Sequence, residues 1–306
     1  MATFVFAPAP KWPVSEFVHL PPCADRGSHV LAELEALPPD LFAGWPVAVA
    51  ARDWLVIDAQ MGIAFHVSMS TRIFLIRHGA TTLSAEDRFA GATDVPLSDI
   101  GREQVRRLAD RLRGDHITAV YASPLGRTVE TARILSAPHG LEVETRDGLR
   151  EISHGRWEQK TRHEVEEQFP EEAAAWDEDP YTFAPVGGES GLAVTARALP
   201  VLMEIVRAHP GGNVAVVSHK ATIRLLLSSL LGFDPRRYRD NLDQSPAALN
   251  IVDFKDPVRA RLTLFNDTSH YDQAGLAIPA IPTARLSKWW DGPAVSRAAA
   301  TPPPAA

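Results

Sequence analysis

The chain has 306 residues, of which 45% are hydrophobic and 23% charged, values that suit a soluble α/β protein of one large or two small domains. Its formal net charge of -7 argues against a surface that binds nucleic acid or an anionic membrane. The single cysteine, Cys23, excludes an internal disulfide. The sequence has no zinc-type Cys/His spacing, no run near the roughly 18 apolar residues of a membrane span and no signal peptide, so we expect a cytoplasmic protein.

Residues 1–69 are the hardest segment to assign. They contain Pro-Pro pairs at 21–22 and 38–39, scattered tryptophans and one short helical candidate, Ser28 to Leu37. Met69 stands just before the first regular element. Two interpretations stay open: an N-terminal extension of unknown role, or upstream sequence included by a wrongly chosen start codon, with Met69 as the true start. A dedicated functional domain is a third.

From Thr71 onward, apolar runs alternate with helical patterns. The first half of this region predicts a strand over 72–77, a helix over 98–113 capped by Ser98, a strand over 117–122, and a helix from Ser123-Pro124 to about Ala137. In that second helix, the serine is the expected N-cap and the proline the first helical residue.

The second half continues the alternation. It predicts short extended pieces over 141–144 and 148–152, an acidic helical stretch in two segments over 161–179, a helix over 189–208, a buried strand over 214–218, a helix over 219–231, and closing strands over 247–254 and 259–265. Residues 273–306 form an Ala/Pro-rich tail that is predicted to be disordered. Strands alternating with helices predict an α/β domain over 70–272, with a mostly parallel central sheet flanked by helices.

Three predicted strands are followed by polar, reactive residues. The first ends in Arg77-His78, the second leads into a helix whose first turn carries Arg127, and the third ends in Ser218-His219. Ligands of open parallel sheets bind outside the carboxyl ends of the strands, so these groups can face one crevice. Two helix starts add partial positive charge, and the arginine fork can grip two phosphate oxygens. The pattern therefore predicts a phosphate pocket.

A carboxylate, Glu151, follows in the stretch 149–152. It would repel a phosphate ligand, so we interpret it as a proton donor to a leaving oxygen, with a pKa raised by partial burial. Taken singly, each residue has an ordinary structural explanation. These are a buried histidine bonded to backbone (His78), a surface arginine paired with Glu130 or Glu142 (Arg127), a salt bridge to Arg146 or Arg150 (Glu151), and a helix cap (His219). Their joint occurrence at strand ends favours a site.

The order of the motifs resembles the histidine phosphatase superfamily, also called the phosphoglycerate mutase-like family. The matching stretches are Arg77-His78-Gly79-Ala80-Thr81, Asp94-Val95-Pro96-Leu97-Ser98, Ser123-Pro124-Leu125-Gly126-Arg127-Thr128-Val129-Glu130-Thr131-Ala132, Leu149-Arg150-Glu151-Ile152, Gly155-Arg156-Trp157-Glu158, Gly187-Gly188-Glu189-Ser190 and Val217-Ser218-His219. They span about residues 72–265, so the first 69 residues and the tail lie outside the resemblance.

The resemblance implies a role for each central residue. His78 would be the nucleophile that forms a phosphohistidine. Arg77, Arg127 and His219 would hold the phosphoryl oxygens and stabilise charge in the transition state. Glu151 would protonate the leaving alcohol and then activate the attacking water. No metal or other cofactor is implied, because the arginines supply the positive charge.

Several positions depart from the usual family pattern. Ala80, Ser84 and Ala90 stand where Glu, Asn and Gln are common, and Gln159 and Lys220 stand where Gly is common. Ser84, Gly91 and Lys220 join Arg77, Arg127 and Glu151 in the predicted substrate-binding set. We expect Ser84 to reach the phosphoryl group through water. Lys220 either adds charge at the pocket mouth or points to solvent, and solvent is favoured.

The predicted function is hydrolysis of a small phosphorylated metabolite by a member of the phosphatase branch. Cofactor-dependent mutases of the family usually carry a longer, more basic insertion after the catalytic Glu, whereas residues 163–181 here are acidic. A phosphoglycerate mutase is the alternative. A non-catalytic phospho-ligand-binding protein is a lesser one, because both His78 and Glu151 are present. Sugar phosphates, phosphoglycerate-type acids and α-ribazole phosphate stay open as substrates, as does the oligomeric state.

Overall fold

The computed structural model describes residues 3–6, 48–50, 54–58, 63–66, 70–83 and 88–272. The first four ranges are strands of an antiparallel sheet with the order β1-β4-β3-β2. They are β1 (Thr3–Phe6), β2 (Ala48–Ala50), β3 (Trp54–Asp58) and β4 (Ile63–His66). The sequence did not predict them. The helical candidate at 28–37, Met69, Ser84 and the tail over 273–306 lie outside the described residues.

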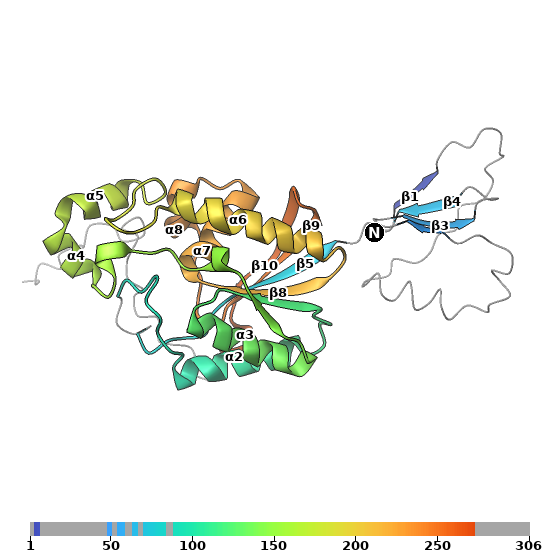
Figure 1. The fold of residues 1–306 in the computed structure, drawn as a ribbon, viewed down its shortest axis with the longest axis horizontal. Coiled ribbons are helices and arrows are strands. Elements are labelled where there is room, and N and C mark those ends of the chain that lie inside the picture. The colour runs from blue at the N-terminus through green and yellow to red at the C-terminus, as the bar shows by residue number, and fades with distance from the viewer. Residues whose placement is uncertain are drawn as a thin grey trace, which may run out of the picture.

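A six-stranded sheet with the order β10-β9-β5-β8-β6-β7 forms the centre of the fold (Figure 1). Its strands are β5 (Thr71–Arg77), β6 (Ala119–Ala122), β7 (Val143–Thr145), β8 (Asn213–Ser218), β9 (Leu249–Asp256) and β10 (Arg259–Asp267). Strands β5, β8, β6 and β7 are parallel, whereas β9 runs antiparallel to β5 and β10 antiparallel to β9. The predicted mostly parallel α/β sheet is confirmed in a mixed form, because the closing strands β9 and β10 form a hairpin.

The predicted helices occur in the predicted order, and the short helices α8 and α9 were not predicted. The described helices are α2 (Asp99–Leu112), α3 (Gly126–Ser136), α4 (Arg162–Gln168), α5 (Pro170–Glu178), α6 (Gly191–Ala208), α7 (Lys220–Leu231), α8 (Tyr238–Asn241) and α9 (Ser269–Asp272). The described residues also form the 3-10 turns η2 (Ala137–His139), η3 (Asp147–Leu149), η4 (Gly155–Trp157) and η5 (Pro235–Arg237). The prediction of an extended piece over 148–152 is wrong. Residues 148 and 149 belong to the 3-10 turn η3, and residues 150–152 form no regular element.

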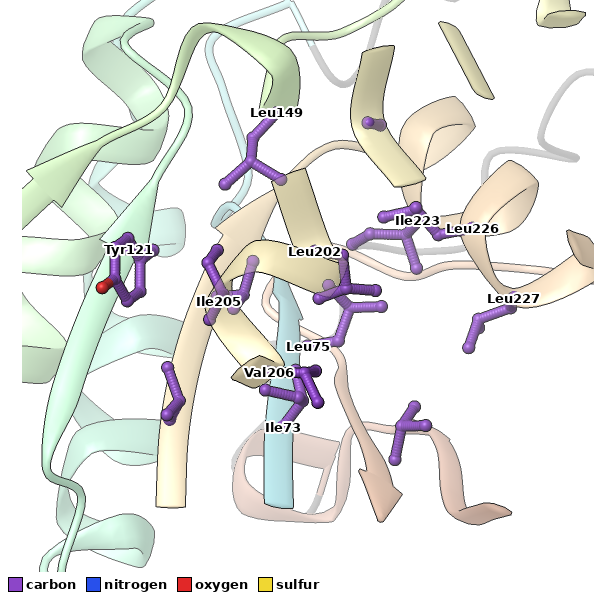
Figure 2. Close-up of a cluster of buried hydrophobic side chains, with 14 of the residues drawn as sticks. Ile73, Leu75, Tyr121, Leu149, Leu202, Ile205, Val206, Ile223, Leu226 and Leu227 are labelled. Carbon is purple, nitrogen blue, oxygen red and sulfur yellow. The ribbon is translucent and has the colours of Figure 1, made fainter. Parts of the chain in front are cut away.

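Strand β5 is buried on both faces because helices cover both sides of the sheet. Ile73 and Leu75 pack on one side with residues of α6 and α7, including Leu202 (Figure 2). Phe74 and Ile76 pack on the other side with residues of α2 and α3. The continuous apolar run that predicted a buried strand therefore contributes to two separate hydrophobic clusters. Because these clusters hold β5 in place, they also fix where Arg77 and His78 lie at its carboxyl end.

The start of α3 differs from the prediction. The helix begins at Gly126 with Leu125 at the N-cap position, so Ser123 does not cap it. The carboxylate of Asp94, from a distant loop, accepts the Gly126 amide at 3.0 Å and takes over that role. Ser123 is fully buried, and its hydroxyl lies 2.8 Å from Nε2 of His219. The serine is thus released from capping and turned toward the strand ends.

Candidate active site

The carboxyl ends of β5, β8 and β6 bring the predicted histidines together. Arg77 pairs with Ser218 in the parallel register of β5 and β8, so His78 and His219 follow at the same edge of the sheet. Their ring centroids are 5.2 Å apart in an edge-on arrangement. Strand β6 ends one residue before Ser123. Residues from three separate stretches of sequence therefore meet at one edge, as the sheet topology predicts.

His78 is held in a single tautomer by the backbone carbonyl of the next residue, Gly79. Its Nδ1 lies 2.7 Å from the Gly79 carbonyl oxygen. A carbonyl oxygen can only accept, so Nδ1 carries the ring proton and Nε2 keeps a free lone pair. Burial, followed by the charges of Arg77 and Arg127, holds the pKa of His78 well below its ordinary value. The ring is thus neutral and nucleophilic at Nε2.

The Arg77 guanidinium uses only part of its hydrogen-bonding capacity within the protein. Its Nη1 donates to the carbonyl oxygen of Gln244 at 2.6 Å, whereas its Nε is buried without a hydrogen-bond partner among the described residues. Burial lowers the pKa of Arg77 to about 10, and the nearby Glu151 carboxylate opposes that shift. The group stays charged at neutral pH. A buried, unsatisfied N–H on a cation is the donor that an anionic ligand would complete.

Arg127 is buried rather than on the surface, with 2% of its area exposed. Its two terminal nitrogens donate to the carbonyl oxygens of Thr93 at 2.7 Å and Gly91 at 2.8 Å. Burial lowers its pKa, and Glu151 is the largest opposing influence. The surface-arginine alternative is wrong, because Glu130 instead accepts a hydrogen bond from Arg102 at 2.6 Å.

Glu158 fixes the loop that holds Arg127. Its carboxylate accepts from the amides of Gly91, Ala92 and Thr93, at 3.1, 3.0 and 3.3 Å, and from the Thr93 hydroxyl at 2.8 Å. A Cβ at Gly91 would lie 1.8 Å from the Ile152 carbonyl oxygen, so only glycine fits there. Gly91 therefore supports Arg127, since its amide is taken by Glu158 and its carbonyl by the guanidinium.

Glu151 is held by backbone donors rather than by a salt bridge. Its carboxylate accepts from the amides of Ile152, Ala221 and Thr222 at 3.0, 3.0 and 3.1 Å. The last two belong to the first turn of α7, where free N–H groups favour an acceptor. The predicted alternatives for Glu151 are wrong, since Arg146 pairs with Glu144 and Arg150 with Asp147.

His219 is fully buried at the N-cap position of α7, but its side chain makes no cap hydrogen bond, so the capping alternative is wrong. Its Nε2 contacts the Ser123 hydroxyl, and its Nδ1 is buried without a partner in the described part of the chain. Burial, then the charges of Arg127, His78 and Arg77, holds its pKa well below the ordinary value.

Lys220 and Ser84 complete the predicted set. The Lys220 side chain is 24% exposed, and its Nζ lies 3.7 Å from an Asp243 oxygen that also accepts from Arg224. The lysine therefore turns toward Asp243, and the solvent orientation that the sequence favoured is wrong. Ser84 lies outside the described residues.

Sequence reasoning missed several supporting residues. Glu158 stood in a matched motif but carried no role, and Ser123 was taken for a helix cap. A carboxylate three residues after Gly155, in the matched stretch 155–158, was a usable signal for Glu158. Ser123 offered no such signal. Within the described residues, no group of three His, Cys, Asp or Glu side chains could hold a metal ion, and none of the helices has the length and apolar character for a membrane crossing.

The chain is similar to known phosphatases and mutases. A family model described as the histidine phosphatase superfamily, branch 1, matches residues 73–268. Phosphoserine phosphatase 1 of Hydrogenobacter thermophilus is 35% identical over 167 residues, covering 55% of this chain and 79% of the relative. A probable phosphoglycerate mutase of Yersinia enterocolitica is 32% identical over 213 residues, covering 67% and 97%. The solved structure of a mycobacterial glucosyl-3-phosphoglycerate phosphatase has a TM-score of 0.59 and 30% identity, covering 64% of this chain and 99% of that one.

Proposed function

Because the chain belongs to the histidine phosphatase superfamily, we propose that it hydrolyses a small phosphomonoester in the cytoplasm through a phosphohistidine formed on His78. The observation that carries the proposal is the pair of buried, unsatisfied groups at one sheet edge, Nε of Arg77 and Nδ1 of His219, beside a histidine whose Nε2 lone pair is free. The two unsatisfied nitrogens call for an acceptor that the described residues do not supply, and a phosphoryl oxygen beside the His78 ring would be such an acceptor.

In the first step, Nε2 of His78 attacks the phosphorus atom and the ester P–O bond breaks. Arg77, Arg127 and neutral His219 donate to the phosphoryl oxygens, which carry most of the charge in the transition state. Glu151 gives its proton to the departing alcohol oxygen. The site then holds a phosphohistidine and a Glu151 carboxylate, and the alcohol leaves.

In the second step, water replaces the alcohol. Glu151 takes a proton from the water as its oxygen attacks phosphorus, and the bond between phosphorus and Nε2 breaks. Inorganic phosphate leaves, and His78 and Glu151 return to their starting states. The same two side chains therefore serve both halves of the cycle, with no group consumed.

The acidic segment after Glu151 supports a phosphatase over a mutase. It forms α4 and α5, and four of its carboxylates are already paired with arginines: Glu164 with Arg88, Glu166 and Asp177 with Arg162, and Glu172 with Arg156. The remaining acidic groups add negative charge, which disfavours retention of a doubly phosphorylated ligand. The phosphoglycerate mutase alternative is kept because one relative bears that name.

The deciding experiment measures release of inorganic phosphate from a panel that includes an aryl phosphate, phosphoserine, 3-phosphoglycerate and sugar phosphates, each with and without EDTA. We expect phosphate release from at least one small monoester, unchanged by EDTA. Loss of activity in EDTA with recovery in magnesium would contradict the arginine-based pocket. Conversion of 3-phosphoglycerate to 2-phosphoglycerate faster than phosphate release, in the presence of 2,3-bisphosphoglycerate, would favour the mutase.

A further inference from the structure

Ser123 and His219 share a buried hydrogen bond that the proposed mechanism does not use. Both residues have 0% exposed area, and the Ser123 hydroxyl oxygen lies 2.8 Å from Nε2 of His219. The Leu125 amide donates to the same hydroxyl oxygen at 3.4 Å. Nδ1 of the histidine has no partner within the described ranges. Nε2 of His219 is therefore hydrogen-bonded within the protein, whereas Nδ1 is open to a hydrogen bond with a ligand.

The direction of this bond follows from counting donors and acceptors. A hydroxyl has one proton and a neutral imidazole has one N–H, so either partner could donate. If Nε2 donated, the hydroxyl proton would be buried without an acceptor and the Nδ1 lone pair without a donor. If the hydroxyl donates, its proton is satisfied and only Nδ1–H remains open. Unsatisfied buried polar groups are costly, so the second arrangement is favoured.

We infer that Ser123 is a positioning residue that sets the tautomer of His219, keeping the proton on Nδ1 so that this nitrogen donates to a phosphoryl oxygen. The inference rests on the proposed function for the identity of the acceptor. It explains how His219 can act as a donor without a positive charge. Its low pKa, caused first by burial, keeps the ring neutral. A neutral ring can donate from only one nitrogen, so the tautomer decides whether it helps or repels the ligand.

The tautomer can be read directly by ¹⁵N NMR of protein labelled at histidine. Protonated and unprotonated ring nitrogens have well-separated chemical shifts, and the His219 signals are assigned by their loss in His219→Ala. We expect Nδ1 to carry the proton in the native protein at neutral pH. In Ser123→Ala we expect the His219 signals to shift toward a mixture of both tautomers. A native protein with the proton on Nε2 would overturn the inference.

Kinetics supply a second, independent readout. We expect Ser123→Ala to lower kcat by about tenfold, the population change that loss of one hydrogen bond allows, and Ser123→Thr to recover most of the loss because it keeps the hydroxyl. Ser228→Ala is the matched control, since Ser228 is also fully buried and its hydroxyl has no partner within the described residues. Equal kcat in native protein and Ser123→Ala, with both folded, would reject the role.

The two readouts separate this inference from the proposed function. Protein that releases phosphate from no substrate of the panel, yet carries the proton on Nδ1 of His219, would reject the phosphatase and leave the tautomer assignment intact. Active protein with the proton on Nε2 would support the phosphatase and reject the tautomer assignment. If Ser123→Thr fails to fold because the added methyl group has no room, the spectrum of the native protein still decides the question.

Discussion

The proposed phosphate pocket and the α4–α5 segment are built by different means. In the pocket, backbone groups hold the charged side chains: carbonyl oxygens of Thr93 and Gly91 hold Arg127, and amides of α7 hold Glu151. The α7 amides are fixed by the helix to which they belong, and the loop that carries Gly91 and Thr93 is fixed by the Glu158 carboxylate. The pocket is therefore suited to chemistry that stays the same across different substrates.

The α4–α5 segment is held by side chains instead. Arg162 bridges Asp177 at 2.6 Å and Glu166 at 2.8 Å, and the Arg239 guanidinium lies 3.6 Å from the centre of the Trp176 ring. Trp176 of α5 also packs in a hydrophobic cluster with Phe89 and Trp157. Figure 1 shows α4 and α5 at one end of the helical layer, next to α8. A few side-chain substitutions could reshape such a segment, so we propose that it governs which leaving group is accepted.

The largest loss should come from removing the nucleophile. We expect His78→Ala to lower kcat by on the order of 10⁴ or more, as loss of a catalytic nucleophile does elsewhere, while the far-ultraviolet circular dichroism spectrum stays native. Phosphate release from an aryl phosphate measures the effect. The native protein, but not the variant, should yield an acid-labile phosphoprotein after rapid quenching.

His163→Ala is the matched control for that experiment, because His163 lies on α4 with 77% of its side chain exposed. It should keep native turnover. Undiminished phosphate release by His78→Ala would remove the central residue of the mechanism.

The second-largest loss of kcat should come from replacing the planar guanidinium of Arg127, which backbone carbonyls hold in place. We expect Arg127→Lys to lower kcat by about 10²–10³, the cost of one lost transition-state donor, because an ammonium cannot span the carbonyl oxygens and a phosphoryl group together. The control is Arg133→Lys on the exposed side of the same helix. A variant within threefold of native kcat would show that positive charge alone, without the fork, is sufficient.

The sequence predicted the pocket better than the segment beside it, and the reason is physical. An apolar run that ends in Arg77-His78 is a local pattern, and parallel strands must deliver their carboxyl ends to one edge. The whole central set of Arg77, His78, Arg127, Glu151 and His219 therefore follows from motifs and topology. The family match then agrees with the resemblance on which the roles were assigned.

What the sequence could not predict depends on contacts between distant residues. Ser123 before Pro124 has the local pattern of a helix cap, and only the approach of Asp94 to the Gly126 amide shows that the cap comes from elsewhere. The direction of Lys220 depends on Asp243, which is far along the chain. Local propensity gives no information on such partners, because they are decided by packing.

A smaller effect should follow from weakening the α4–α5 segment. We expect Arg162→Met to raise KM by about three- to tenfold for a bulky phosphomonoester, with kcat for a small one nearly unchanged, and to lower the free energy of unfolding by about 1–3 kcal/mol as charge-assisted hydrogen bonds are lost. Arg106→Met is the control, because Arg106 is 58% exposed and pairs only across one helical turn. An equal fall in kcat for both substrates would place the segment in the chemistry rather than in selection.

A still smaller change is expected with pH. The pKa of His78 is lowered, chiefly by burial, so Nε2 stays unprotonated as pH falls through the ordinary histidine value and is protonated only below it. From pH 7.5 to 6.0, kcat/KM corrected for substrate ionisation should change by less than about twofold, whereas a nucleophile with the ordinary pKa of about 6.5 would lose about fourfold. A midpoint near 6.5 would show that the ring is not held neutral by its surroundings.

The smallest effect should come from removing residues 1–68. We propose that residues 70–272 form the catalytic domain, since the family model begins at Ile73 and every described site residue follows it. Among the residues whose burial the structure describes, the two clusters that bury β5 are drawn from residues 73–271, and we expect a chain that begins at Met69 to keep this hydrophobic core. We expect native kcat and KM and a similar midpoint of thermal unfolding. Insoluble or inactive protein would show that β1 to β4 contribute to the stability of the pocket, and a changed KM alone would assign the extension to substrate selection together with α4 and α5.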